Sequence, residues 1–196
     1  TRGLTKKEYV AFARREGEPI HLNRNTQDYP EIATITNVGQ DTVKEKRGAA
    51  HWHTDQSFKE EVSSVTMLYS VQASSSGGQT LFCDMISAYQ ALDKTVQQRI
   101  DGLMVEHRHG ISVAARPSDH TPVPSKGWDQ NTIVYHPLVR RHPVTRKKTF
   151  YAVAGTSRGI KGMEPGEAEK LLKQLCDHAL QDRFITQHSH SVHDVV

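Results

Sequence analysis

The stretch HWHTDQSF at residues 51–58 carries the most informative pattern in this chain of 196 residues. In an extended strand, side chains two positions apart project to the same side, so His53 and Asp55 can hold one metal ion together. An imidazole and a carboxylate, joined by a second histidine from elsewhere in the chain, form the facial triad of non-haem Fe(II) oxygenases. His51 could pair with His53 on the same face instead, so the spacing alone leaves both pairs open. With 12 histidines in the chain, such a triplet also arises easily by chance, and its context has to decide.

Composition places the chain among globular proteins and excludes several classes of function. Apolar residues make up 36% of the chain and charged residues 24%, which suits a polar but foldable domain. No apolar run approaches the roughly 20 residues of a membrane span, and the start of the chain shows no signal-peptide pattern. The net charge of +3 is too small, and the basic residues too interspersed with acids, to indicate a nucleic-acid partner. Cys83 and Cys176 form no disulfide framework or zinc-thiolate pattern, which favours a reducing cytoplasm.

Two helices have clear sequence signals. Thr5 and Glu8 form a capping box at the start of the first helix, and Gly17 follows its end. Pro165 opens the second helix. The apolar residues of this second helix recur at the spacing of a single stripe, namely Ala168, Leu171, Leu172, Leu175, Cys176 and Ala179. A further helix is expected after Asp93.

The rest of the regular structure is predicted to be strand. Short stretches rich in β-branched or alternating apolar residues lie at 31–38, 63–71, 80–85, 103–109, 133–139, 149–153 and 184–190. His107 and His109 alternate with charged residues, as on a half-exposed strand. The Pro-dotted segment 111–130 is expected to be a long functional loop, for example a lid. Many short strands with few helices predict a β-sandwich or jelly roll with helical additions.

A second motif gives the first one its context. HWHTDQSF at 51–58, followed by GGQTLFCDM at 77–85, resembles the taurine dioxygenase and 2,4-dichlorophenoxyacetate dioxygenase family of Fe(II)/2-oxoglutarate enzymes. That family shows W-H-T-D-x-[ST]-F followed, at a matching separation, by G-G-x-T-x-F/W. The stretches 30–38, 88–92, 136–140 and 183–196 also look like the family, so the resemblance covers nearly the whole chain.

The resemblance implies a fold and a set of site residues. The fold would be mostly β with flanking helices, as a double-stranded β-helix (a cupin-like jelly roll). Two of the three iron ligands would be His53 and Asp55. Thr80 would offer its hydroxyl to a carboxylate oxygen of 2-oxoglutarate, and Gln56 and Ala49 would flank the substrate.

The resemblance also implies parts that this sequence does not contain. In the family, the stretch similar to residues 192–196 continues into a strand of the jelly roll. The distal histidine ligand follows, and then the arginine that pairs with the far carboxylate of 2-oxoglutarate. We therefore expect residues 1–196 to be a single oxygenase domain that lacks its C-terminal strand, and the sequence leaves open whether the N-terminus is incomplete too. His193 stands where relatives usually carry a turn glycine.

The expected function is an Fe(II)- and 2-oxoglutarate-dependent dioxygenase that uses O2 to hydroxylate an unactivated C–H bond. The substrate would be small and anionic, of the sulfonate, sulfate ester or aryloxyalkanoate type, and succinate and CO2 would be released. One alternative is a non-catalytic relative that keeps the fold as a binding or oligomerisation module. A second is a zinc hydrolase on a cupin-like barrel that uses the histidine-rich segment 188–193. Relatives suggest a homodimer or homotetramer without a nucleic-acid or membrane partner.

Overall fold

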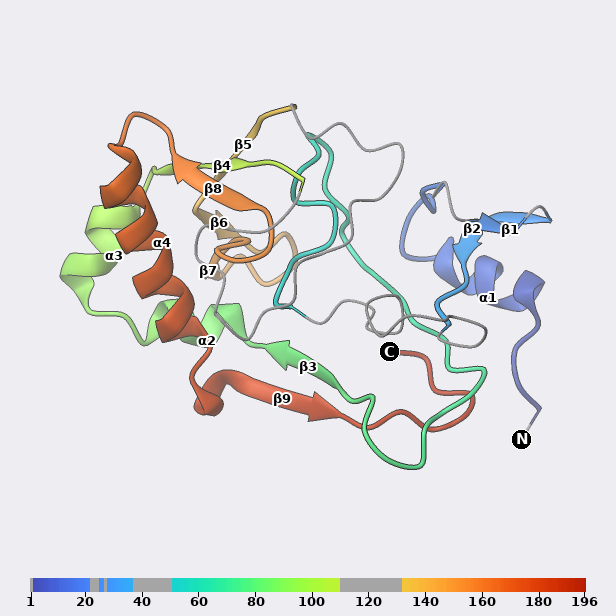
Figure 1. Cartoon of the computed structure of the whole chain (residues 1–196). Coiled ribbons are helices and arrows are strands. Elements are labelled where there is room, and N and C mark those ends of the chain that lie inside the picture. Colours follow the sequence, from blue (N-terminus) through green and yellow to red (C-terminus); the bar gives the residue numbers. More distant parts are fainter. Residues whose placement is uncertain (1, 22–24, 27, 37–50, 110–131) are drawn as a thin grey trace. The chain divides into compact units, whose positions relative to one another are not determined.

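The computed structural model describes residues 2–21, 25–26, 28–36, 51–109 and 132–196 (Figure 1). The chain forms two compact units. The first unit combines Thr1–Gly48, Ser64–Thr80 and His188–Val196, and the second combines Ala49–Ser63 and Leu81–Gln187. The long loop predicted at 111–130 lies outside the described residues, as do the last two residues of the strand predicted at 31–38.

Short strands and helices follow one another along the described chain. In order, they are α1 (Lys6–Ala13), β1 (Asn25–Thr26), β2 (Tyr29–Ala33), β3 (Thr80–Cys83), α2 (Met85–Gln90), α3 (Lys94–Ile100), β4 (Met104–His107), β5 (Val134–Pro137), β6 (Val139–Arg141), β7 (Lys148–Phe150), β8 (Ser157–Ile160), α4 (Pro165–Ala179), a 3-10 helix (Asp182–Phe184) and β9 (Ile185–His188). The pairs β1–β2, β4–β5, β4–β8 and β6–β7 are antiparallel. Short antiparallel strands with flanking helices agree with the predicted class, while the closed jelly roll and its absent C-terminal strand stay predictions.

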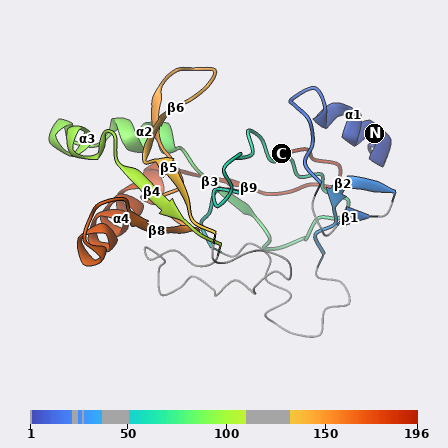
Figure 2. The ribbon, with the colours of Figure 1, turned by 90° about the horizontal axis from the view of Figure 1, so that it is seen from above.

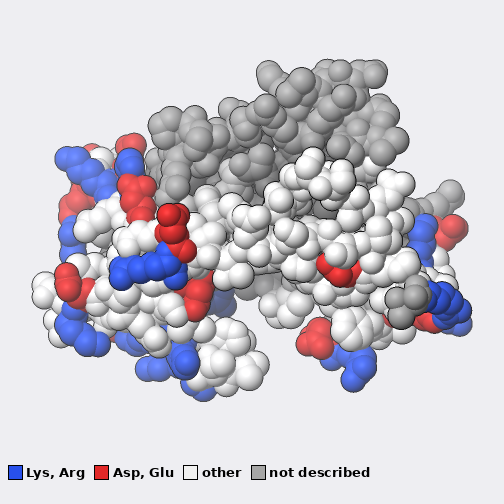
Figure 3. All heavy atoms as spheres, turned by 90° about the horizontal axis from the view of Figure 1, so that it is seen from below, with Lys and Arg blue, Asp and Glu red and all other residues white. Residues whose placement is uncertain are grey.

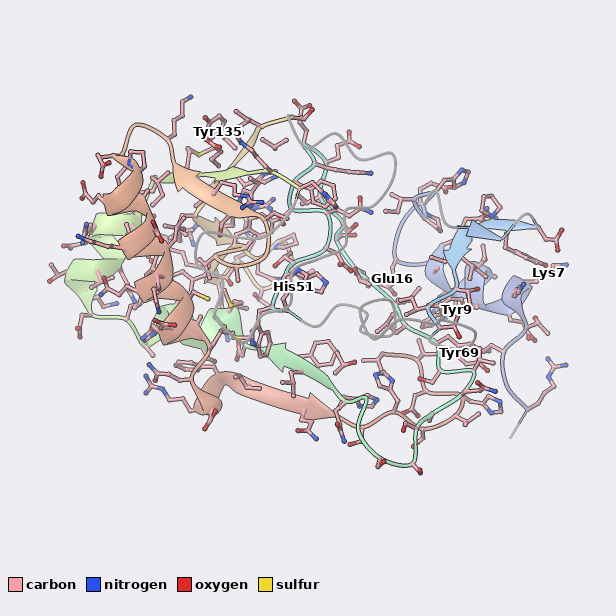
Figure 4. The ribbon with its side chains drawn as sticks, in the orientation of Figure 1. Lys7, Tyr9, Glu16, His51, Tyr69 and Tyr135 are labelled. Carbon is pink, nitrogen blue, oxygen red and sulfur yellow. The ribbon has the colours of Figure 1, made fainter. Side chains whose placement is uncertain are left out.

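Helix α1 of the first unit begins as the sequence predicts. The Glu8 backbone N–H donates to the Thr5 hydroxyl at 3.2 Å, and the Thr5 backbone N–H donates to the Glu8 carboxylate at 2.8 Å. The Tyr9 hydroxyl donates to the Met67 carbonyl at 2.8 Å, and its ring centroid lies 5.6 Å from that of Tyr69 (Figure 4). These contacts attach α1 to the segment that follows residue 63 in the same unit.

The strand predicted at 63–71 is wrong over most of its length. The structure forms only an isolated bridge there, between Tyr69 and Val195. Leu68 exchanges backbone hydrogen bonds with Val196 on one side of this bridge. On the other side, Ser70 bonds to the backbone near Asp194. The alternating sequence predicts extended backbone, but a strand also needs a partner, and the segment opposite pairs only around this bridge.

A three-stranded antiparallel sheet with the order β5-β4-β8 forms one layer of the second unit, and α4 packs beside β8 (Figure 2). The central strand β4 alternates as a one-sided strand should, because Val105 and His107 are fully buried while Glu106 is half-buried. The predicted strand 133–139 is divided between β5 and β6 by a bend at Leu138, which donates its N–H to the Leu103 carbonyl at 2.8 Å and accepts the Tyr151 N–H at 2.9 Å.

Helix α4 packs its apolar stripe into the hydrophobic core of the second unit. The stripe predicted from the sequence is confirmed. All of the predicted stripe residues are buried, namely Ala168, Leu171, Leu172, Leu175, Cys176 and Ala179. They pack with Ile100, Leu138 and Phe150 in one hydrophobic cluster. The helix starts where predicted, with Pro165 in its first turn and the Glu164 side chain capping it.

On the face in Figure 3, the basic and acidic side chains of the described residues lie next to each other. In the part of the chain that the structure describes, no helix is both long enough and apolar enough to span a membrane.

The prediction that His107 lies on a half-exposed strand is confirmed, because β4 turns the fully buried His107 side chain toward the core and leaves Glu106 half-buried on its other face. Its Nδ1 atom lies 2.9 Å from the Thr156 hydroxyl. Burial, with the nearby His136 as the second cause, lowers the pKa of His107 to about 3. His107 is therefore neutral in the folded protein at any pH near neutrality.

This burial makes stability fall as the pH drops below about 6.5, the ordinary pKa of histidine in an unfolded chain. The unfolded state then takes up a proton that folded His107 refuses until the pH nears 3, so the free energy of unfolding should decrease by about 2 kcal/mol between pH 7 and pH 5. Urea unfolding at both pH values measures this. His107→Asn should remove that part of the pH dependence, and His21→Asn, at an exposed position, should not. An unchanged pH dependence in His107→Asn would contradict the assignment.

Candidate metal centre

His53 and Asp55 bring a nitrogen and an oxygen together at one point of the second unit. Both residues lie on an irregular segment, not on the extended strand assumed from the sequence, and a turn begins at Asp55. His53 Nε2 lies 3.1 Å from Asp55 Oδ1. First-row metal ions bind such atoms at about 2.0–2.2 Å, so two ligands at a right angle are about 3.0 Å apart. The side chains keep 31% and 45% of their surface exposed, so neither is enclosed in the core.

The tautomer of His53 also suits a metal ligand. Its Nδ1 lies 2.8 Å from the His51 backbone carbonyl, which can only accept, so Nδ1 carries the hydrogen. The Nε2 lone pair of the neutral ring therefore faces Asp55, and histidine ligands are usually held by such a bond from the other ring nitrogen. The hydrogen bond to Asp55 raises the pKa of His53, against the opposing effect of burial.

The sequence left open whether His51 pairs with His53 as a ligand. In the structure, His51 contacts His53 through its backbone carbonyl and its ring. Its backbone carbonyl orients the His53 ring, and the two ring centroids lie 5.2 Å apart (Figure 4). Within the described ranges, no three or more His, Cys, Asp or Glu side chains are grouped so as to hold a metal ion. His53 and Asp55 could thus supply two ligands of a larger set.

Gly155 presses its backbone against His53, a contact that the sequence did not reveal. A Cβ atom built on Gly155 would lie 2.8 Å from His53 Cβ and 3.0 Å from His53 Cα. The residue also has a φ of +79°, which favours glycine. The backbone at Gly155, between β7 and β8, therefore packs against His53 and restricts its position.

A buried chain of hydrogen bonds holds the other end of the ligand segment. Ser57 is fully buried and donates its hydroxyl hydrogen to the Thr54 carbonyl at 3.0 Å. Because that hydrogen is used, the Thr156 hydroxyl must donate to Ser57 Oγ, 2.6 Å away. Thr156 in turn accepts from Nδ1 of His107 at 2.9 Å. The segment is tied to the central strand β4 through the motif residue Ser57 and through Thr156 and His107, which no motif singled out.

The other predicted site residues have separate surroundings. Gln56 is half-buried with a φ of +56°, a conformation that costs a non-glycine residue on the order of 1 kcal/mol. Thr80 belongs to the first unit, at the start of β3, where its hydroxyl lies 2.8 Å from His190 Nε2. Ala49 lies outside the described residues. The roles of these three residues stay predictions, as do the histidine and arginine expected beyond Val196.

The turn near the end of the chain fits the family resemblance of the sequence. His193, which replaces the usual turn glycine, has a φ of +77°. A glycine adopts this conformation without strain, which explains why relatives would carry one there.

Comparison with known proteins gives consistent results. A family model described as "Taurine catabolism dioxygenase TauD, TfdA family" matches residues 2–196. The α-ketoglutarate-dependent 2,4-dichlorophenoxyacetate dioxygenase of Cupriavidus pinatubonensis is 31% identical, over 98% of this chain and 71% of its own length. The (S)-phenoxypropionate/α-ketoglutarate-dioxygenase of Sphingobium herbicidovorans is 30% identical, over 98% of this chain and 69% of its own length.

Solved structures agree with the sequence relatives. The crystal structure of a taurine dioxygenase from Burkholderia xenovorans superposes with a TM-score of 0.77 at 27% identity. The match covers 99% of this chain and 62% of that protein, so the chain spans less than two thirds of its length.

The contact between Gly155 and His53 can be tested with a pair of glycine variants. Gly155→Ala should weaken Mn(II) binding by about 10-fold or more, because the added methyl group displaces His53. Gly162 is a matched control, since its φ is +78° and nothing lies within 4 Å of an added Cβ. Titration with Mn(II), followed by electron paramagnetic resonance, measures the affinity in each variant, and thermal unfolding checks the fold. Equal losses of affinity in the two variants would show that the contact with His53 does not matter.

Proposed function

Because the chain belongs to the taurine catabolism dioxygenase TauD, TfdA family, we propose that the protein carrying it is an Fe(II)- and 2-oxoglutarate-dependent dioxygenase that hydroxylates a small anionic substrate. The named relatives are α-ketoglutarate-dependent dioxygenases, a class that uses Fe(II), 2-oxoglutarate and O2. Succinate and CO2 would be the co-products.

The 3.1 Å approach of His53 Nε2 to Asp55 Oδ1 is the observation that carries this proposal. These two atoms would hold the iron, and the His51 carbonyl would keep the imidazole in the tautomer that can bind it. Fe(II) with 2-oxoglutarate supplies the activation of O2 for attack on a C–H bond. The protein's own contribution is to keep the ligand segment rigid, through Gly155 and the hydrogen bonds of Ser57.

For the co-substrate, the proposal gives Thr80 the role of a hydrogen-bond donor to a carboxylate oxygen of 2-oxoglutarate. Support comes from the G-G-x-T pattern at 77–80 and from the position of Thr80, half-buried at the first residue of β3. A hydroxyl donating to an ionised carboxylate forms a charge-assisted hydrogen bond, which is stronger than a neutral one.

For the substrate, a pocket of about 420 Å³ in the second unit offers positive charge. It is lined by Glu106, Arg108, His109 and Arg158. Among the described residues of this lining, Glu106 is the single acidic one, and its carboxylate accepts from Arg108 Nε at 2.8 Å. Arg158 therefore gives the lining an excess of positive charge.

The pocket adjoins the segment that carries the proposed ligands. The His109 ring packs edge-on against Phe58, with centroids 5.1 Å apart, and Phe58 comes three residues after Asp55. The compounds in the relatives' names are 2,4-dichlorophenoxyacetate, (S)-phenoxypropionate and taurine, and each carries a carboxylate or a sulfonate. Arg158 would bind such a group as a bidentate partner.

Removing the carboxylate ligand tests the reaction. Asp55→Ala should lower the succinate yield from 2-oxoglutarate by at least about 100-fold, because one proposed iron ligand is lost. Asp101→Ala, which removes an exposed carboxylate paired with Lys148 at 3.0 Å, should retain full activity. Succinate is measured with Fe(II) in air, with 2,4-dichlorophenoxyacetate and taurine as trial substrates. Unchanged turnover in Asp55→Ala would refute the ligand assignment. An unsubstituted protein that binds Mn(II) but not 2-oxoglutarate would support the non-catalytic alternative.

The substrate pocket has its own test. Arg158→Gln should raise the KM for the anionic substrate about 10-fold or more, the usual effect of losing a hydrogen bond to a charged group. The KM for 2-oxoglutarate should not change. Arg99→Gln serves as the control, because Arg99 lies exposed on α3 and pairs with Glu167 at 3.2 Å. If Arg158→Gln and Arg99→Gln have the same KM for the substrate, the pocket does not bind it.

A further inference from the structure

His190 lies between two hydroxyl groups of the first unit. Its Nε2 atom is 2.8 Å from Thr80 Oγ1, and its Nδ1 atom is 3.0 Å from Ser70 Oγ. All three residues are half-buried. Thr80 and Ser70 are 110 and 120 positions from His190 in the sequence, so only the fold brings them together.

A neutral His190 can make its two hydrogen bonds in two ways, which differ in where the hydrogens lie. A neutral imidazole has one N–H donor and one acceptor nitrogen. If Nδ1–H donates to Ser70, Nε2 accepts the Thr80 hydroxyl hydrogen, and Thr80 has no hydrogen left for a carboxylate. If Ser70 donates to Nδ1, Nε2–H donates to Thr80 Oγ1, and the Thr80 hydrogen is free. A protonated His190 donates from both nitrogens and also leaves that hydrogen free.

We propose that His190 and Ser70 are positioning residues that hold the Thr80 hydroxyl as a donor to a carboxylate of 2-oxoglutarate. This inference rests on the proposed function of Thr80. An ionised carboxylate can only accept hydrogen bonds, so it selects the arrangement in which hydrogens run from Ser70 through His190 to Thr80. Thr80 Oγ1 then accepts the hydrogen of Nε2 with one lone pair, which leaves its own hydrogen free to point at the carboxylate.

One neighbouring ring restricts the His190 side chain. The His188 ring lies against it edge-on, with centroids 4.7 Å apart and planes at 87°. His188 Nε2 in turn lies 3.2 Å from the Asp194 carboxylate, which also accepts the Ser191 backbone N–H at 2.7 Å. The His190 ring is therefore packed against a ring that itself lies next to the Asp194 carboxylate.

Variants of His190 separate positioning from simple packing. His190→Leu removes both ring nitrogens and should raise the Kd for 2-oxoglutarate about 10-fold, as expected for one misdirected hydrogen bond to a charged group. His190→Gln can place an amide N–H near the position of Nε2 and should restore most of the affinity. Ser70→Ala should weaken 2-oxoglutarate binding less. This variant removes the hydrogen bond at His190 Nδ1, while His190 Nε2 can still donate to Thr80. His193→Asn, in the same segment, should bind normally, since asparagine tolerates its positive φ.

The measurement is calorimetric titration of the Mn(II)-loaded protein with 2-oxoglutarate, with Mn(II) affinity and thermal unfolding measured for each variant. Mn(II) affinity should be unchanged in His190→Leu. In a Thr80→Val background, His190→Leu should have no further effect, because His190 acts through the Thr80 hydroxyl.

The outcomes distinguish this inference from the function on which it rests. If Thr80→Val weakens 2-oxoglutarate binding but His190→Leu does not, the positioning role is wrong and the proposed function stands. The positioning role is equally wrong if His190→Leu and His190→Gln bind equally weakly, or if the effects of Thr80→Val and His190→Leu add. If the unsubstituted protein does not bind 2-oxoglutarate, or if Thr80→Val binds it normally, the role of Thr80 itself is wrong.

Discussion

The contact between the Gly155 backbone and His53 is the constraint on which the candidate metal centre depends. A ligand pair is useful only if its two donor atoms stay at the separation that an ion requires, and side chains on an irregular segment would otherwise sample many rotamers. The backbone behind His53, the carbonyl beside its Nδ1 and the buried Ser57 hydroxyl together restrict that freedom. Rigidity here comes from packing and hydrogen bonds, since the segment belongs to no strand.

One short piece of chain, residues 155–158, links three parts of the second unit. Gly155 supports the ligand segment, and Thr156 continues the hydrogen-bond chain into the core. Arg158, on β8, reaches the basic pocket. Because β8 pairs with β4, which carries the pocket residue Glu106, a shift in either strand would move the proposed ligand segment and the lining of the pocket together.

The histidines show how strongly surroundings decide the chemistry of one side chain. His53 faces a carboxylate and keeps a raised pKa, whereas His107 is fully buried and neutral with a pKa of about 3. His190 sits between two hydroxyls and could control where their hydrogens point. In the sequence all three stand among polar neighbours, so spacing alone could not separate these roles.

The sequence by itself determined what local rules govern. The capping box at Thr5, the apolar stripe of α4 and the His53–Asp55 spacing all depend on residues within a few positions of one another, and the structure contains each of them. The tertiary structure decided what depends on distant partners, such as the short pairing near Tyr69 and the approach of Gly155 to His53. Such contacts join residues about a hundred positions apart, and local periodicity carries no information about which distant backbone will lie alongside.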